Sequence, residues 1–478
     1  MPRPDQNCGT SACTPARQRL PLGRKQEAHP ITPDLQHLTN ALLEAAKNAG
    51  AEAADAMAVA GTSLSIGVRG GTLEQAERSE GVDIGLRVLL GQKQANVSAS
   101  DIRPETLTAL AERAVAMAHE APDDPNIGLA EPDQLAREWN INALELTDPR
   151  SEPSPKDLQQ NAAKAEAAAL AVKGISQVQS ASATYSKTSV HLAASNGFSG
   201  GYARTGTSLS CVAIAGTGSE MERDYDGDGR IFRADMRSAG DIGTSAATRA
   251  VDRIGARKPP TGAYPVLFDE RISSSLIGHF LSAINGSAIA RGSSWLRDAL
   301  GTQVLPDTLS ILEDPHRRRV SGSRPFDAEG LPTTTRRIVD HGTLTGWTLD
   351  LATGRKLGMA STGNAKRGLS SPPSPGTWNI ALTQGDQTRE DLLADMGTGL
   401  LVTSLIGSTI NPNTGDYSRG ASGFWVENGV LQYPVNECTI AGSLPQMLRR
   451  IIPANDARTH LSTVVPSLLI EGMTLAGS

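Results

Sequence analysis

The sequence predicts an α+β protein in which N-terminal α/β layers are followed by a β-rich C-terminal domain. Helical apolar periodicity alternates with strand-like runs over about the first 260 residues. Beyond about residue 262, one helical run is followed by short β-like segments separated by Gly, Pro and Asn. Aromatic residues make up only 4% of the chain, so its cores must be built from Ala, Val, Ile and Leu.

Composition divides the chain into four segments. The basic N-terminus has no apolar run of signal-peptide length and is expected to be a disordered tail. A polar, Pro-rich connector begins near residue 122, and KPPTGAYPVLFDE marks a boundary near residue 260. The expected segments are a tail at 1–30, an N-terminal α+β domain at 31–122, a middle α+β region with β-hairpins at 123–260, and the C-terminal domain at 261–478.

Helix signals are clear at four places before residue 260. In the first helix, at 31–50, Thr32 would be the N-cap, Pro33 the first helical residue and Gly50 the stop. The second begins near Pro104, and the others cover about 156–172 and 240–256.

Strands are predicted between these helices. DAMAVAGTSLSIGVRGG and VDIGLRVLLGQKQANVSAS read as two strand-like runs separated by the polar segment 72–81. Farther on, TSVHLAAS and TSLSCVAIAG alternate clearly, and Asn196–Gly197 between them predicts a hairpin turn.

The charge, the apolar content and the cysteines of the chain exclude some classes of function. A net charge of −6 argues against a dedicated nucleic-acid binder. The sequence contains no run of 18 consecutive apolar residues, so no membrane-spanning helix is expected. Cysteines at 8, 13, 211 and 438 form no CxxC pair, which favours a reducing, cytoplasmic setting.

One stretch, DYDGDGRIFRAD, fits a calcium-loop template. Asp224, Asp226 and Asp228 fall on the first, third and fifth ligand positions, Gly229 on the sixth and Asp235 on the twelfth. However, the run before it alternates like a strand, whereas a calcium loop of this type lies between helices. A polar β-turn would use the same residues, so a turn and a calcium-binding module at 224–235 are both retained as hypotheses.

Several long segments, in one order along the chain, resemble the TldD/PmbA family. They include MERDYDGDGR, IGHFLSAINGSAIARGSSWLRDALG, RPFDAEGLPTTTRRIVDHGTLTGW, RKLGMASTGNAKRG and NTGDYSRGASGFWVENGVLQYPVNECTIAGSLPQML. The resemblance covers about residues 39–478 and implies a TldD/PmbA-like fold.

The zinc-binding residues of one branch of the family can be compared with the residues at the same positions in this chain. The TldD branch carries an HExxxH helix and a distant Cys as metal ligands, and its Glu can activate water. When the GH of SSSLIGHFL is set against the GH of that motif, Ser274 and Ser275 take the places of the first His and the Glu. His279 is the one surviving His, and His460 lies near the position of the missing Cys. The chain therefore resembles the non-zinc PmbA (TldE) branch, and no metal or other cofactor is expected in it.

The segment GDYSRGASGFWVENG concentrates aromatic residues in a chain that has few. Tyr417, Phe424 and Trp425 could anchor a β-core. Together with Asp416 and Arg419, they could instead line a cleft for extended peptide or contact a partner. Both interpretations are retained.

The resemblance implies a non-catalytic or regulatory subunit of a cytoplasmic metallopeptidase complex that cleaves unfolded or extended peptides. Its expected partners are a TldD-like zinc subunit and the peptide substrate, with a homodimer as an option for the chain alone. Whether the chain is itself an enzyme is left open. The enzyme alternative is a self-sufficient metallopeptidase with an atypical metal site, for instance His279 with His460.

Overall fold

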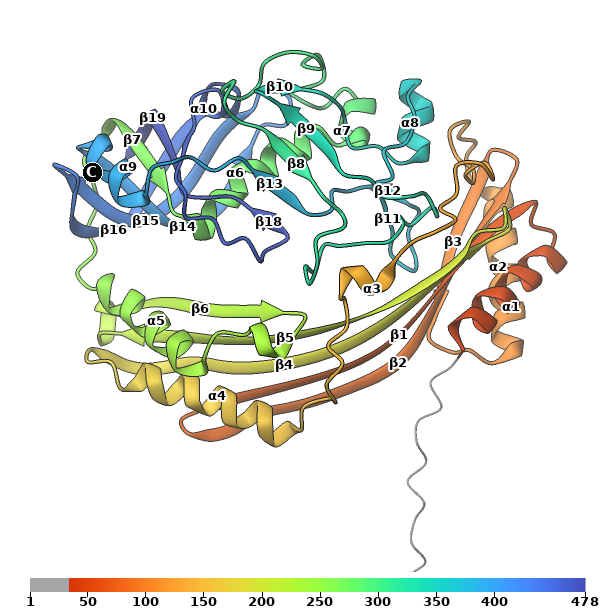
Figure 1. Cartoon of the computed structure of the whole chain (residues 1–478), viewed down its shortest axis with the longest axis horizontal. Coiled ribbons are helices and arrows are strands. Elements are labelled where there is room, and N and C mark those ends of the chain that lie inside the picture. Colours follow the sequence, from red (N-terminus) through yellow and green to blue (C-terminus); the bar gives the residue numbers. More distant parts are fainter. Residues whose placement is uncertain (1–33, 478) are drawn as a thin grey trace, which may run out of the picture. The chain divides into compact units, whose positions relative to one another are not determined.

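A computed structural model describes residues 34–477 (Figure 1). The predicted tail at 1–30 and the predicted cap at Thr32 lie outside the described residues. The first helix, α1 (Leu35–Asn48), begins after Asp34, whose carboxylate accepts hydrogen bonds from the backbone N–H groups of Gln36 and His37. The mixed α/β architecture predicted from the sequence is confirmed.

The N-terminal half is built on an antiparallel sheet in the order β3-β2-β1-β4-β5-β6. The predicted hairpin at Asn196–Gly197 is confirmed, since it joins β4 to β5 and Gly197 has a φ of 97°. The strands are β1 (Ala53–Arg69), β2 (Thr72–Leu90), β3 (Lys93–Ala99), β4 (Ile175–Ala194), β5 (Ser199–Ala215) and β6 (Glu222–Arg230).

The polar segment 72–81 is not a break between strands, as the sequence suggested, but the first half of β2. Its residues are exposed on both faces of the strand. Because β3 pairs only with Ile84–Leu90, no strand of the described chain covers the outer edge of this half. A strand that buries neither face needs no apolar alternation, which explains why the pattern missed it.

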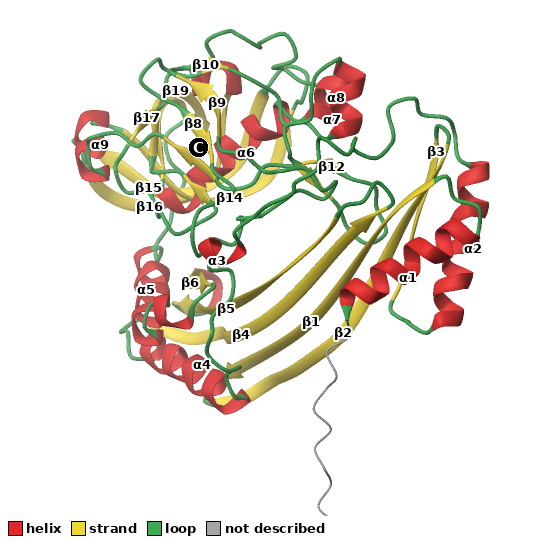
Figure 2. Cartoon of the chain, turned by 45° about the vertical axis from the view of Figure 1, so that its right-hand side comes forward, coloured by secondary structure: helices red, strands yellow, loops and turns green. Residues whose placement is uncertain are grey.

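Two pairs of helices cover this sheet (Figures 1 and 2). α1 and α2 (Pro104–Glu120) pack at one end over a core that includes Leu42, Ile84 and Leu86. α4 (Pro155–Leu170) and α5 (Ala239–Asp252) pack at the other end over a core rich in alanine. These two helices cross closely, since a Cβ at Gly243 would overlap the carbonyl of Ala165. The short helix α3 (Ile141–Leu144) lies in the connector before α4.

The C-terminal half contains a mixed sheet in the order β16-β15-β14-β7-β19-β17 and a smaller one in the order β10-β9-β8-β13-β18. The first comprises β7 (Gly262–Phe268), β14 (Gly399–Ile410), β15 (Asp416–Glu427), β16 (Val430–Ser443), β17 (Ile452–Pro453) and β19 (Leu468–Ala476). The second comprises β8 (Ile311–Glu313), β9 (Arg336–Asp340), β10 (Thr343–Leu344), β13 (Ile380–Leu382) and β18 (Thr463–Val464), and β11 (Ala365–Lys366) pairs with β12 (Ser374–Pro375).

The longest helix of this half, α6 (Glu270–Ala283), packs its buried residues Leu276, Ile277 and Phe280 into the main core. The remaining helices are α7 (Gly286–Ala290), α8 (Leu351–Leu357), α9 (Arg389–Met396) and α10 (Leu444–Leu448). None of the helices in the described part of the chain is long and apolar enough to cross a membrane.

One contact between the two halves lies where the segment after β11 packs on the first sheet. The fully buried guanidinium of Arg367 forms an ion pair with Asp55 on β1, which also pairs with Arg87 on β2. A Cβ at Gly85 of β2 would overlap the carbonyl of Leu369, so the two backbones are in close contact. Burial opposes ionisation of Asp55, but the two arginines outweigh it and lower its pKa.

Candidate functional site

The N-terminal half of α6 carries Ser274 and Ser275, the residues that align with the metal motif. Asp269 caps the helix, and its Oδ1 accepts a hydrogen bond of 3.1 Å from the backbone N–H of Arg271. The Arg271 side chain lies 3.2 Å from Asp269 Oδ1 and 3.0 Å from Asp224 Oδ1 on β6. This ion-pair chain fixes the start of α6, and with it Ser274 and Ser275, against the edge of the first sheet.

Residues 224–230 of the calcium-like string lie in the strand β6, and not in a turn. Because side chains alternate along β6, Asp224, Asp226 and Asp228 lie on one face, and all three are buried. Each faces arginine: Asp224 pairs with Arg253 and Arg271, Asp226 with Arg237 and Arg249, and Asp228 with Arg230.

Asp235, the fourth predicted calcium ligand, lies beyond β6 and pairs with Arg319 at 3.2 Å. Burial opposes the charge on Asp226, but Arg249 and Arg237 outweigh it and lower its pKa. The arginines thus occupy the carboxylates that the calcium hypothesis requires. Calcium binding at 224–235 stays an untested prediction.

The structure does not bring the two histidines of the alternative metal site together. His279 lies on α6 beside Tyr417, with ring centroids 6.0 Å apart, whereas His460 Nε2 lies 3.6 Å from Asp228 Oδ1. Burial lowers the pKa of both, with a further contribution from Arg419 at His279 and from Arg230 at His460.

The donor set at this position of α6 does not match the zinc motif. Ser274 and Ser275 offer hydroxyls where the metal motif has imidazole and carboxylate. Among the described residues, no group of three or more His, Cys, Asp or Glu side chains is placed to hold a metal ion. Cys438 is buried 3.2 Å from the Ala421 carbonyl oxygen, and burial raises its pKa to about 11.

Ser274 and Ser275 line a cavity of about 950 Å³. Its walls come from α6, from β14 and β15 of the C-terminal sheet, from β4, β5 and β6 of the first sheet, and from Arg253 at the end of α5. The charged side chains on these walls are Glu222, Arg223, Asp224, Arg253, Arg271 and Arg419. His279 does not line this cavity but a separate one of about 410 Å³.

One wall is a strand with a free edge. β14 pairs with β15 along most of its length, but β7 pairs with it only at Leu400–Val402. From Thr403 to Ile406, no strand of the described chain occupies that second edge. Backbone donors and acceptors at such an edge can pair with an extended peptide.

Of the residues predicted to form either a β-core or a peptide cleft, some are buried in the core and others line cavities. Trp425 is 2% exposed and packs edge-to-face against Tyr264 with ring centroids 5.0 Å apart, and Tyr417 is also 2% exposed. Phe424 lines a neighbouring cavity of about 500 Å³, and Arg419 lines the cavity beside α6. Asp416 is exposed and accepts a hydrogen bond of 2.6 Å from Thr414.

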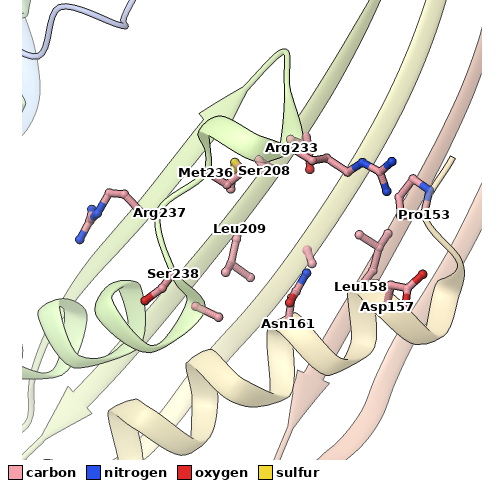
Figure 3. A pocket seen from close by; sticks show the side chains of 13 residues that line it. Pro153, Asp157, Leu158, Asn161, Ser208, Leu209, Arg233, Met236, Arg237 and Ser238 are labelled. Carbon is pink, nitrogen blue, oxygen red and sulfur yellow. The ribbon is translucent and has the colours of Figure 1, made fainter. Parts of the chain in front are cut away.

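A smaller cavity of about 260 Å³ lies between the first turns of α4 and α5 on the other face of the first sheet (Figure 3). Its cationic residues are Arg233 and Arg237. Arg237 pairs with Asp226 at 2.8 Å, and Arg233 donates to the Ser151 carbonyl oxygen at 2.5 Å. Because both cations have partners, we assign no ligand to this cavity.

Solved structures of other proteins share this architecture. A crystal structure from Bacteroides thetaiotaomicron, of a candidate modulator of DNA gyrase, has 26% identity and a TM-score of 0.86 over 94% of this chain and 100% of that one. The structure of TldE from Thermococcus kodakarensis shares the fold, with 19% identity and a TM-score of 0.80 over 92% of this chain and 100% of that one. This chain therefore has the fold of these modulator-of-gyrase and TldE structures.

Sequence comparison is more specific. Residues 54–118, 148–254 and 261–477 match domain 1, the central domain and the C-terminal domain of the PmbA/TldA metallopeptidases. The metalloprotease PmbA of Escherichia coli is 38% identical over 91% of this chain and 94% of its own length. A metalloprotease PmbA homolog of Haemophilus influenzae is 36% identical over 97% of this chain and 100% of its own. The chain belongs to the PmbA/TldD family.

Proposed function

We propose that this chain is the non-catalytic or regulatory subunit of a cytoplasmic TldD/TldE-type metallopeptidase complex that cleaves unfolded or extended peptides. The observation that carries the proposal is the pair of hydroxyls, Ser274 and Ser275, where the resemblance places a zinc-binding imidazole and the catalytic carboxylate. Without those groups, the chain has no side chain there to hold zinc or to activate its water.

Two further observations support the proposal. Haemophilus influenzae has both the PmbA homolog described above and a metalloprotease TldD homolog, which is 25% identical over 257 residues. The cavity beside α6 with its free β14 edge also suits extended peptide, which pairs through its backbone. On this view the partner cuts the peptide, and this chain helps to hold it.

Co-expression tests the proposal. An affinity tag on this chain should retain a TldD-like protein from the same genome, and the pair should digest casein in the presence of zinc. A matched control uses the same pair with the glutamate of the partner's HExxxH motif replaced by glutamine, which should co-elute but leave casein intact. Digestion of casein by this chain alone with zinc would instead favour the self-sufficient metallopeptidase.

A further inference from the structure

We propose that the cavity beside α6 binds a carboxylate group of a peptide, with Arg419 as the receiving cation. This inference rests on the proposed function only in taking peptide as the ligand. Where a metallopeptidase uses a metal ion to attract the oxygen of its substrate, this chain would use a fixed guanidinium.

The charges on the cavity walls are unequally compensated. Arg253 lies 3.5 Å from carboxylate oxygens of both Glu222 and Asp224, and Arg271 is held between Asp224 and Asp269. These two arginines have no charge to spare for a ligand.

Arg419 differs from them. Its Nε donates to the Gly407 carbonyl oxygen at 2.7 Å, which fixes the guanidinium, and it pairs with no carboxylate of the described chain. Arg419 also interacts with the Tyr417 hydroxyl. This interaction lowers the pKa of Tyr417, but burial outweighs it and raises the pKa to about 12. A guanidinium has five N–H donors in a fork that matches a carboxylate, so a fixed Arg419 has donors left for one. Arg223, also on the cavity wall, has no ion pair among the described residues either.

Hydroxyl groups add polar partners on the α6 side. Ser274 and Ser275 line the cavity together with Thr403. Thr403 is 8% exposed, and its buried Oγ1 has no hydrogen-bond partner within the described chain. A buried hydroxyl without a partner costs free energy, so native proteins seldom retain one unless water or a ligand can satisfy it.

The rim of the cavity is apolar and exposed. Ile406, Tyr225 and Met221 all line it, with exposed fractions of 69%, 57% and 50%. Exposed apolar side chains that gather around one cavity mark a binding surface rather than random exposure. With the free edge of β14 next to them, they suit a short extended peptide whose carboxylate reaches Arg419.

The test uses the purified full chain without any partner. The probe is an N-terminally fluorescein-labelled hexapeptide of alternating valine and threonine with a free C-terminal carboxylate. Its binding is followed by fluorescence anisotropy at low salt, because screening weakens ion pairs. Amidation of the C-terminus should weaken binding about tenfold, since the pairing anion is lost. An amidated peptide with one internal aspartate shows whether an acidic side chain can replace the terminus.

Substitutions identify the cation. Arg419→Gln should weaken binding of the free-carboxylate peptide about tenfold and abolish the difference between free and amidated peptides. Arg419→Lys should retain part of that difference, because it keeps the charge without the fork. Arg113→Gln, which removes an exposed charge on α2, is the matched control and should change nothing. Thermal unfolding of each variant confirms that it folds.

Equal binding of free, amidated and aspartate-containing peptides would overturn the inference, and so would full retention of binding by folded Arg419→Gln and Arg419→Lys. Neither result depends on a zinc partner. Failure here is therefore distinct from failure of the co-elution experiment, which tests the proposed function.

Discussion

Asp327 and Glu329 are buried close to each other with little cationic compensation. Asp327 accepts hydrogen bonds from three backbone N–H groups, and Glu329 Oε2 accepts one of 2.9 Å from Leu351. Burial raises the pKa of Asp327 to about 6 against those hydrogen bonds. Burial, with the neighbouring charges of Asp327 and Asp350, raises the pKa of Glu329 well above its usual range, although Arg87 opposes this.

A raised pKa means that the folded state holds the proton more tightly than the unfolded state does. The stabilisation from Glu329 is therefore complete below its unfolded pKa of about 4.5 and is lost as pH rises through the higher folded pKa. Glu329→Gln resembles the protonated form at every pH. We expect its free energy of unfolding to increase relative to that of wild type as pH rises above about 4.5, because only the wild type loses stability there. Urea titrations across that range measure this, with the exposed Glu112→Gln as control. A difference that does not change with pH would contradict it.

At the scale of elements, the ladder of ion pairs between β6 and α5 gives a second prediction. Asp226→Ala should lower the free energy of unfolding by about 1–2 kcal/mol, because it leaves Arg237 and Arg249 unpaired while both stay partly hydrated. Asp252→Asn on the same helix is the control. Burial and the neighbouring Asp224 raise the pKa of Asp252, so its loss should be neutral or stabilising. Urea unfolding measures both, and added Ca²⁺ should not shift the wild-type curve. A calcium-dependent shift that is lost in Asp226→Ala would support the calcium hypothesis.

The success of sequence reasoning also varied between elements. Local chemistry predicted the hairpin at Asn196–Gly197 and placed α5 close to its observed range, because turn residues and helical periodicity act within a few residues. Family resemblance singled out Ser274 and Ser275, and the cluster of aromatic residues singled out Arg419. It missed Thr403, which reads as an ordinary strand residue until β14, α6 and β6 meet in space. These three elements are far apart in the sequence and form the cavity only in the folded chain, so no local sequence pattern marks Thr403.

At the scale of the whole molecule, Arg367 links the two halves. Arg367→Ala should lower the free energy of unfolding by about 3 kcal/mol, because it removes one partner of a buried ion pair. Because Asp55 would keep only Arg87, we expect the first sheet to unfold earlier than the C-terminal half. Differential scanning calorimetry with hydrogen exchange of β1 and β2 measures this separation, and the exposed Lys356→Ala is the control. Identical unfolding of wild type and Arg367→Ala would refute the link.

The uncovered half of β2, residues 72–81, exposes a strand edge through which copies of the chain can associate in solution. Its outer edge presents a row of backbone groups on which another copy of the same strand could stack, the first step toward a fibril. Glu74, Glu77 and Glu80 make such stacking repulsive, since identical copies in register would bring like charges together. The acidic composition of this segment therefore protects solubility, and neutralising these glutamates would make the protein prone to aggregate even though its core stays untouched.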